Sequence, residues 1–241
     1  MTRTTVYVDG LNLYYGALRH TDYKWLDLAA FGRRLISAND QLVTVKYFTA
    51  QISSSASEDA KAPGRHRVLI RAIQATPGVE VFEGKFQVPL KWRSVAPRLS
   101  WQDRFRPSPN RMTAWMLDRS EARSERPLKV RVQVPEERFT DVAMATHLVN
   151  DFHTKACDRA ILVTNDGDLK IAVKLVVEAG HTVDVISPAT SVNRELQREA
   201  TSARPLRREI LPSCQMQDRV ALAKGYVERP KVWKKSTEAH P

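Results

Sequence analysis

The amino-acid sequence predicts an α/β fold with three layers, in which helices cover both faces of a central, mostly parallel sheet. Three observations predict this fold. Short apolar, β-branched segments alternate with helix-like segments in both halves of the chain, which is typical of βαβ units. Apolar residues make up 42% of the 241 residues, enough to bury a sizeable core. No apolar run approaches the roughly 20 residues that a membrane-spanning helix needs.

The first half of the chain supplies the first strands and the helices between them. Strands are predicted where β-branched residues cluster or alternate with polar ones, at residues 4–8, 42–48 and 79–82. Helices are predicted where apolar residues recur at helical spacing, at residues 12–18, 26–36 and 65–75. A Thr-Pro-Gly sequence at 76–78 ends the last of these helices.

The second half resumes the same alternation. Strands are predicted at residues 130–134, 160–164 and 182–186. A helix over 141–152 is predicted from the recurrence of Val142, Ala145, Val149 and Phe152 every three or four residues. A second helix over 169–179 ends at Gly180, which is a typical C-terminal cap.

The alternation breaks between residues 84 and 128, where five prolines and repeated basic-aromatic groups occur. Between residues 85 and 131 there are twelve Lys and Arg residues and only four acids. We therefore expect one domain over residues 1–200, interrupted by a basic, Pro/Trp/Arg-rich insertion at 85–128. Residues 201–241 are predicted to form a basic C-terminal extension that packs on the domain or trails from it.

The charge and cysteine content restrict the partners and the compartment. The formal net charge is +11 and the pI is about 9.9, which favours polyanionic partners such as RNA or DNA. The first residues carry no apolar stretch of signal-peptide type. Two cysteines, far apart and without metal-type spacing, argue against a disulfide scaffold or a zinc ribbon. A reducing cytoplasm is the predicted location.

Acidic residues follow two of the predicted strands at the point where each strand ends. Asp9 follows the first strand, and Asp166 and Asp168 follow the apolar strand at 160–164. Ligands of parallel α/β sheets bind outside the carboxyl ends of the strands, so these carboxylates converge if the two strands are close neighbours. Asp141, which opens a helix, is a candidate fourth member.

Carboxylates gathered in this way repel one another and need a counter-charge to stay ionised. Mg²⁺ supplies one, because it takes oxygen ligands while keeping several waters. The chemistry that follows is metal-assisted phosphodiester hydrolysis. Each acid also has a structural alternative: Asp141 favours the helix dipole, Asp168 caps a helix, and Asp9 with Gly10 forms a turn.

Two further polar residues accompany the acids. Asn12, three residues after Asp9, is predicted either to aim its amide at Asp9 or to cap the helix that begins there. His147 lies six residues after Asp141 and does not closely share its helix face. A solvent-facing histidine is the first interpretation of His147, and a substrate contact or proton donor is the second.

Four segments resemble parts of the NYN domain, a PIN-like nuclease family that includes LabA-like bacterial proteins. Residues 6–13 (VYVDGLNL) resemble its opening hydrophobic-D-G-x-N-hydrophobic motif, and residues 162–169 (LVTNDGDL) resemble its V-S-G-D-S-D-hydrophobic motif. Residues 137–143 (ERFTDVA) lie where the family usually has E-K-G-x-D-V-x. The ending, residues 211–212 with 229–233, looks like the tail of LabA-like members.

The resemblance implies a PIN-like fold and a Mg²⁺- or Mn²⁺-dependent nuclease that acts mostly on RNA. By matching motif, it implies metal-site roles for the acids Asp9, Asp141, Asp166 and Asp168, with Asn12 orienting them. The chain departs from the family pattern at four positions, which hold Arg138, Phe139, His147 and Gly167. No departure removes a core acid, but those at 139 and 147 leave the rate and the substrate preference open.

The basic insertion is predicted to hold single-stranded RNA, because Lys and Arg bind phosphates and aromatic rings stack on bases. The candidate nucleic-acid contacts are Lys91, Trp92, Arg93, Arg104, Arg106 and Arg111. The alternative is that its aromatic residues pack on the domain or on a second subunit of a homo-oligomer.

The function predicted from the sequence is therefore a metal-dependent endoribonuclease. An RNA-binding regulatory protein that keeps the fold but has little or no turnover is the alternative. A phosphatase of the haloacid dehalogenase type ranks lower, because its Asp-x-Asp motif is missing after Asp9. Membrane-surface binding ranks lowest, since the charge lies on no clear amphipathic helix.

Overall fold

The computed structural model describes residues 1–50, 59–87, 89–94, 129–133 and 136–234. The chain divides into two compact units. The larger unit comprises Met1–Phe86 with Glu137–Pro241, and the smaller unit is Gln87–Glu136.

The larger unit is built on a seven-stranded sheet with the order β6-β3-β2-β1-β7-β8-β9. Its strands are β1 (Thr2–Asp9), β2 (Asp40–Ala50), β3 (Val79–Gln87), β6 (Glu136–Arg138), β7 (Arg159–Val163), β8 (Thr182–Ser187) and β9 (Ser202–Pro205). The pairs from β3 through β2, β1, β7 and β8 to β9 are all parallel. The predicted α/β class with a mostly parallel sheet is therefore confirmed.

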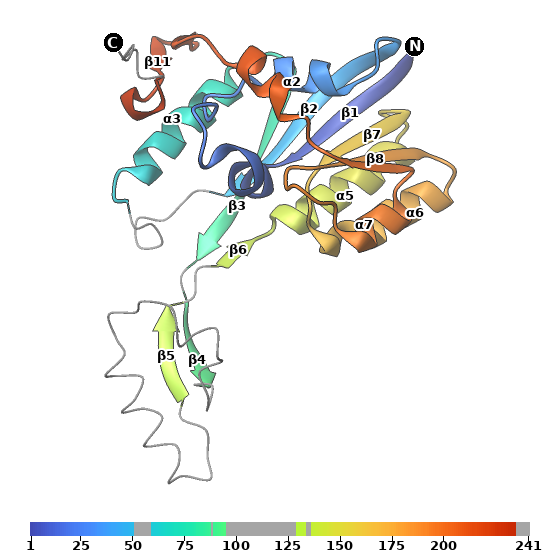
Figure 1. Ribbon diagram of the computed structural model, residues 1–241, viewed down its shortest axis with the longest axis horizontal. Helices are drawn as coiled ribbons and strands as arrows, with labels where there is room; N and C mark the ends of the chain where they lie inside the picture. The colour runs from blue at the N-terminus through green and yellow to red at the C-terminus, as the bar shows by residue number, and fades with distance from the viewer. Residues whose placement is uncertain (51–58, 88, 95–128, 134–135, 235–241) are drawn as a thin grey trace. The chain divides into compact units, whose positions relative to one another are not determined.

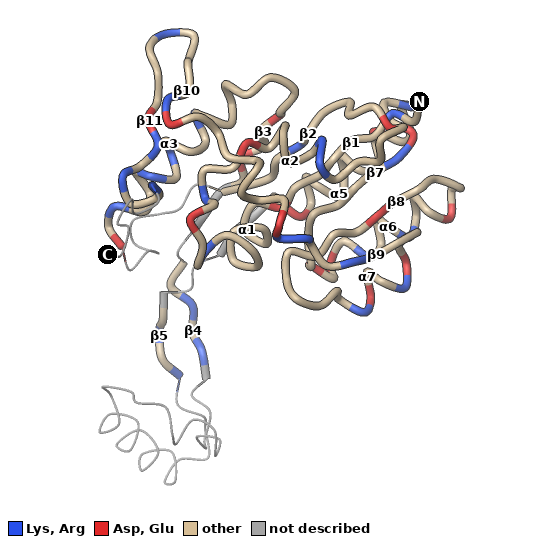
Figure 2. The backbone as a smooth tube through the Cα atoms, turned by 45° about the horizontal axis from the view of Figure 1, so that its top comes forward, with Lys and Arg blue, Asp and Glu red and all other residues tan. Residues whose placement is uncertain are grey.

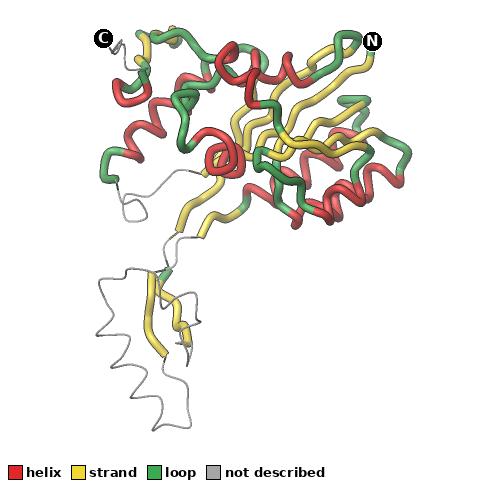
Figure 3. The backbone as a smooth tube through the Cα atoms, viewed as in Figure 1, coloured by secondary structure: helices red, strands yellow, loops and turns green. Residues whose placement is uncertain are grey.

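Helices lie on both faces of this sheet, as Figures 1 and 3 show. They are α1 (Gly10–Leu13), the π-helix η1 (Tyr14–Leu18), α2 (Leu28–Leu35), α3 (Ala62–Gln74), α5 (Thr140–His153), η4 (Gly167–Leu169), α6 (Lys170–Glu178) and α7 (Arg194–Glu199). Helices α2 and α3 cover one face, and α5, α6 and α7 cover the other. Because both faces are covered, the central strands read as continuous apolar runs rather than alternating ones.

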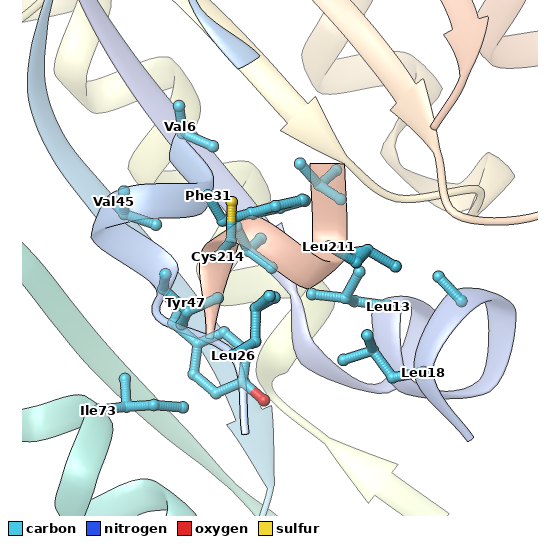
Figure 4. Close-up of a cluster of buried hydrophobic side chains, with 14 of the residues drawn as sticks. Val6, Leu13, Leu18, Leu26, Phe31, Val45, Tyr47, Ile73, Leu211 and Cys214 are labelled. Atoms are coloured by element: carbon cyan, nitrogen blue, oxygen red, sulfur yellow. The ribbon is translucent and has the colours of Figure 1, made fainter. Parts of the chain in front are cut away.

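Strand β1 shows this double burial directly. Val6, Tyr7 and Val8 are all completely buried, although successive side chains of a strand point to opposite faces. Val6 and Val8 belong to the cluster under α2 and α3, which Figure 4 shows in part. Tyr7 belongs to the cluster under α5 and α6. The strand that ends in Asp9 is thus fixed from both sides.

Helix α5 is rotated differently from what its sequence pattern suggests. Two of the residues used to predict it, Val142 and Val149, are 69% and 38% exposed. The buried stripe is instead Met144, Leu148 and Phe152, together with Asp151. The apolar pattern locates the helix correctly, but it does not reveal which side faces the sheet, because both stripes carry apolar residues.

A buried polar contact explains the observed rotation of α5. The carboxylate of Asp151, 4% exposed, accepts hydrogen bonds from the Tyr7 hydroxyl and from the Lys46 ammonium, each at 2.6 Å. These donors lie on β1 and β2, so the contact ties the helix to the two central strands. A buried carboxylate without such partners would be strongly destabilising. The contact therefore also sets the position of Asp141 at the start of the same helix.

The C-terminal segment packs onto the α2 and α3 face. It contains η5 (Arg208–Cys214), the hairpin of β10 (Arg219–Ala221) and β11 (Tyr226–Glu228), and η6 (Lys231–Trp233). Leu211 and Cys214 are buried within the cluster shown in Figure 4. The indole N–H of Trp25, which is fully buried, donates to the Gln217 carbonyl at 2.8 Å. Strand β9, just before this segment, is one of the two edge strands of the sheet.

The described part of the smaller unit is an antiparallel hairpin of β4 (Leu90–Ser94) and β5 (Lys129–Gln133). Lys and Arg recur along both strands, as Figure 2 shows. The Arg131 guanidinium lies 5.8 Å from the centroid of the Trp92 ring.

Two observations concern the compartment. Both cysteines, Cys157 and Cys214, are buried free thiols. Among the described residues, no helix has the length and apolar content to cross a membrane. The cytoplasmic location stays a prediction.

Candidate active site

The sheet order brings the two acidic strand ends together. Strand β1 pairs directly with β7, and Val8 is the partner of Val163. Asp9 therefore leaves the sheet beside Thr164, and Asp166 follows two residues later. The requirement that these two strands be close neighbours is met, since they are adjacent and parallel.

Asp9 is held by neutral donors. Its Oδ1 accepts from the Asn12 backbone N–H at 2.9 Å, and its Oδ2 accepts from the Asn12 amide at 2.6 Å and the Thr164 hydroxyl at 3.1 Å. Burial raises the pKa of Asp9, these hydrogen bonds lower it in part, and the nearby charge of Asp166 raises it again. Asn12 thus both caps α1 and orients the carboxylate, so its two predicted roles coexist.

Gly10 is needed beside Asp9 for a packing reason. A Cβ atom at this position would lie 2.7 Å from the Tyr47 hydroxyl and 2.9 Å from the Phe48 carbonyl oxygen. Both distances are too short for real contacts, so a side chain here would push α1 away from β2. The glycine of the Asp-Gly pair therefore lets Asp9 and Asn12 take their positions.

A chain of amide groups links this site to the start of α7. The oxygen of the Asn12 side chain accepts from the Asn165 backbone N–H at 3.3 Å. The Asn165 side-chain oxygen in turn accepts from the Asn193 backbone N–H at 2.7 Å. Asn165 was not singled out from the sequence. Its position between the strand and Asp166 is the only signal that could have found it.

Asp166 shapes the loop that carries Asp168. The Asp166 backbone N–H donates to the Thr164 hydroxyl at 3.1 Å, and its Oδ1 accepts from the Asp168 backbone N–H at 2.9 Å. Asp166 is therefore the cap of η4, the role that the sequence suggested for Asp168. Gly167 occupies the family's serine position, where a Cβ would lie 2.9 Å from the Asn193 amide nitrogen.

Asp141 reaches this group from the start of α5. Partial desolvation, followed by the charges of Asp166, Asp9 and Asp168, raises the pKa of Asp141 to about 6. Since Asp141 is solvent-exposed, the three neighbouring carboxylates are the informative cause. The Asp141 carboxylate is thus influenced by the charges of the other three predicted acids.

Phe139, just before α5, has a φ of 83°. This left-handed conformation favours glycine, which is the residue the family usually has at this position. The ring is 60% exposed, so little packing offsets the strain.

The charges around these acids are unbalanced. The ion pairs found within the described residues involve other carboxylates, and Lys170, two residues after Asp168, pairs with Glu195 at 2.8 Å. Oxygen donors without a cationic partner fit a hard divalent ion such as Mg²⁺ or Mn²⁺. Within the described ranges, no group of three or more acids, histidines or cysteines is placed so that it could hold a metal ion. The four acids supply the oxygen ligands that such an ion prefers, without forming a metal cluster among the described residues.

His147 does not join the acids. Its ring is half-buried and packs against Phe82 and Phe48, with centroid distances of 4.2 and 5.7 Å. Burial, followed by the charge of Lys46, lowers its pKa. The prediction of a solvent-facing histidine is wrong, because α5 turns this residue toward the sheet.

The predicted RNA contacts are divided between described and undescribed residues. Lys91, Trp92 and Arg93 lie on β4, where Trp92 is 65% exposed. Arg104, Arg106 and Arg111 lie outside the residues that the structure describes.

Comparison with known proteins gives three similarities. The chain is 28% identical to 6-hydroxy-3-succinoylpyridine 3-monooxygenase HspA of Pseudomonas putida over 258 aligned residues, which cover 96% of this chain and 75% of that protein. It is also similar to the crystal structure of a protein of unknown function from Vibrio parahaemolyticus. That likeness has 15% identity and a TM-score of 0.41, and it covers 85% of this chain and 93% of the other.

The third similarity is to a family model, the NYN domain, which matches residues 110–207. The matched stretch contains Asp141, Asp166 and Asp168, whereas Asp9 and Asn12 lie before it. The match confirms the NYN-domain resemblance over residues 110–207, and the mostly parallel sheet with helices is consistent with a PIN-like fold.

Proposed function

We propose that this protein is a metal-dependent ribonuclease that hydrolyses phosphodiester bonds of single-stranded RNA. The observation that carries the proposal is that Asp9 and Asp166 follow the carboxyl ends of the adjacent parallel strands β1 and β7, where their charges and that of Asp168 add to desolvation in raising the pKa of Asp141. The NYN-domain match supports a nuclease-type fold. The net charge of +11 supports a polyanionic substrate.

The roles of the residues follow from the geometry. Asp9, Asp141, Asp166 and Asp168 would hold Mg²⁺ or Mn²⁺. A bound ion would polarise the phosphoryl oxygen and lower the pKa of a bound water. Asn12 and Thr164 fix the orientation of the Asp9 carboxylate. The Asn165 backbone N–H holds the Asn12 side chain and so helps to position the Asp9 carboxylate indirectly.

The test is cleavage of end-labelled single-stranded RNA in Mn²⁺, in Mg²⁺ and in EDTA. Asp9→Asn and Asp166→Asn keep the hydrogen-bonding oxygen that caps each turn but remove the charge. We expect each to lower the rate at least about 100-fold, or roughly 2.7 kcal/mol in activation free energy. Asp158→Asn, which removes an exposed acid at the other end of the sheet, is the matched control and should leave the rate unchanged.

Loss of activity in EDTA and in both variants would support the proposal. Equal cleavage by wild type and both variants, or undiminished cleavage in EDTA, would refute it. RNA binding without cleavage in every metal would favour the regulatory alternative.

We further propose that the basic insertion binds the RNA strand. Alanine at Arg104 and Arg106 should weaken RNA binding and lower its dependence on salt, because fewer counterions are released. Alanine at Lys91 and Arg93 should have the same effect. Alanine at Trp92 should weaken RNA binding by removing an aromatic ring on which a base can stack. An unchanged salt dependence would argue instead for packing on the domain or on a second subunit.

A second candidate function comes from the curated relative, whose name states that it is a 3-monooxygenase of 6-hydroxy-3-succinoylpyridine. The similarity along 96% of this chain is the observation that favours it. The check is incubation with hydroxypyridines, dioxygen and a reduced nicotinamide as electron donor, followed by analysis for hydroxylated products. We rank it second because the interacting acids suit Mg²⁺ or Mn²⁺ and the basic insertion suits a polyanion.

A further inference from the structure

A cavity of about 90 Å³ lies directly beside the acidic strand end. Its floor is formed by Gly10 and Leu11, the first residues after Asp9, and by Tyr47 and Thr49 on β2. Helix α3 forms one wall, and Trp233 from the C-terminal segment lies at another. The volume is several times the roughly 10–15 Å³ that one water molecule needs.

The walls are largely apolar and aromatic. They include Leu13, Tyr14, Leu26 and Leu69, and Figure 4 shows Leu13 and Leu26 with Tyr47. Trp233 is held in place by Trp25, with 6.3 Å between the ring centroids. Aromatic walls around a volume of this size favour a single flat ring, which they can stack against.

One polar group in this cavity has no partner. Nδ1 of His66 is buried and, within the described part of the chain, accepts and donates no hydrogen bond. Its Nε2 is 3.5 Å from the Thr49 hydroxyl, which leaves the two groups weakly engaged with each other. Buried polar atoms of this kind are rare in native proteins, because each loses its hydration without replacement. A ligand with a polar ring edge would satisfy it.

Positive charge stands at the rim. Lys24 is half-buried and donates to the Thr21 carbonyl at 2.6 Å, and it forms no ion pair with any of the described residues. Arg65 on α3 also lines the cavity and is paired with Asp59. Burial lowers the pKa of Lys24, Asp22 opposes this, and the charge of Arg65 lowers it further. An anionic group at the rim would relieve that repulsion.

We infer that this cavity binds one planar nitrogen-containing aromatic ring that carries an anionic group. The ring stacks between the aromatic walls, a polar atom of its edge meets Nδ1 of His66, and the anion meets Lys24 and Arg65. Trp233, from the part of the tail that the proposed nuclease does not use, closes the site.

Two sources could supply this chemistry. The first is a base of the RNA substrate, and this version rests on the proposed function. Leu11 and Tyr15 line both this cavity and a second pocket, which is also lined by Asn12 and Asn165. An RNA strand bound at the acids would therefore pass next to the cavity. The second source is a free heteroaromatic acid.

The test is titration of the full chain in EDTA, followed by tryptophan fluorescence and calorimetry. The ligands are uridine 5′-monophosphate, cytidine 5′-monophosphate, pyridine-3-carboxylate and, as the anion without an aromatic ring, ribose 5-phosphate. His66→Phe removes the ring nitrogens while keeping an aromatic ring, and Lys24→Gln removes the rim charge. Arg67→Gln, on the exposed side of α3, is the matched control.

We expect at least one ring-bearing anion to bind, with affinity lowered about tenfold or more by His66→Phe and by Lys24→Gln but not by Arg67→Gln. Nucleotide binding alone would identify an RNA base, and pyridine-carboxylate binding alone a free acid. Binding of ribose 5-phosphate as tight as that of the nucleotides, no binding of any ring, or binding unchanged in both variants would overturn the inference.

Thermal unfolding distinguishes a variant that has lost binding from one that no longer folds. Of the two variants, Lys24→Gln is expected to disturb folding less than His66→Phe. The nuclease proposal is judged separately, since Asp166→Asn should abolish cleavage and leave ring binding intact. Ring binding without any cleavage would sink the nuclease and keep the cavity site. Cleavage without ring binding would refute the cavity site and keep the nuclease proposal.

Discussion

The two ends of the central sheet treat their charges in opposite ways. At the amino end, each acid meets an arginine. Arg3 pairs with Asp158 at 2.7 Å, and Arg159 pairs with Asp184 at 2.5 Å and with Asp40 at 3.4 Å. These contacts join the starts of β1, β2 and β7 to β8. Each of these three acids has an arginine partner, so ion pairs stabilise this end of the sheet.

At the carboxyl end, the Asp9 carboxylate accepts from neutral donors among the described residues, and the charges of Asp166, Asp9 and Asp168 add to desolvation in raising the pKa of Asp141. Aspartates at the amino end of the sheet therefore have cationic partners, whereas the four aspartates at the carboxyl end form no ion pair with the described residues. Repulsion among acids destabilises the fold, and such strain is typical of functional sites. The contrast agrees with the proposal that the acids at the carboxyl end bind a divalent cation. Replacing an aspartate by asparagine should therefore change the free energy of unfolding in opposite directions at the two ends of the sheet.

The largest effect on stability is expected for Asp184→Asn. Asp184 is 7% exposed and receives both an Arg159 contact and a hydrogen bond from Ser202. Removing its charge leaves Arg159 poorly paired and should lower the free energy of unfolding by about 3 kcal/mol. Urea unfolding measures this change. A loss no greater than that of the exposed Asp158→Asn would show that the amino end is not stabilised by its ion pairs.

The opposite sign is expected for Asp141→Asn in EDTA at neutral pH. Above pH 6 the Asp141 carboxylate is charged among three others, so removing its charge relieves repulsion. Because Asp141 is exposed, solvent screening limits the gain in stability to about 1 kcal/mol or less. Addition of Mn²⁺ should stabilise wild type more than the variant. A variant less stable than wild type in EDTA would break the comparison between the two ends.

A smaller gain is expected on replacing Phe139 by glycine. The φ of 83° is strained for phenylalanine, and glycine should raise the free energy of unfolding by about 0.5–1 kcal/mol. Lys155→Gly, with a φ of 57° near the other end of α5, is the matched control for relief of strain alone. Both variants should be more stable in thermal unfolding. A change in cleavage is expected only for Phe139→Gly, which borders the acids.

The smallest effect concerns acid stability at the amino end. Hydrogen bonds from Arg3 lower the pKa of Asp158 to about 2. The pair therefore contributes fully above the ordinary aspartate pKa near 4 and is lost as the pH falls toward 2. Asp158→Asn should flatten the dependence of the unfolding temperature on pH in this window. An unchanged slope would mean that the exposed pair contributes nothing measurable.

Much of the sheet could be predicted from the sequence, because buried parallel strands are continuous apolar runs. The predicted strands at 160–164 and 182–186 lie within one residue of β7 and β8. The acids at the ends of two strands could also be found, since parallel strands place their carboxyl ends at one edge. Pairing of β1 with β7, however, joins segments about 150 residues apart, and no local pattern encodes it.

Other features could not be predicted because they depend on tertiary contacts. The rotation of α5 depends on the contact of Asp151 with Lys46 and Tyr7. The place of Trp233 beside Trp25 depends on the whole path of the C-terminal segment. The partnerless Nδ1 of His66 is a property of the packed cavity and not of helix α3 alone.

The central claim is that the four uncompensated carboxylates bind a divalent cation, and the most direct measurement is Mn²⁺ titration of the metal-free protein by calorimetry. The account predicts saturable binding in wild type and in Asp158→Asn. It predicts at least about tenfold weaker binding in Asp9→Asn and in Asp166→Asn. Absence of saturable Mn²⁺ binding in wild type, or equal affinity in all four proteins, would contradict it.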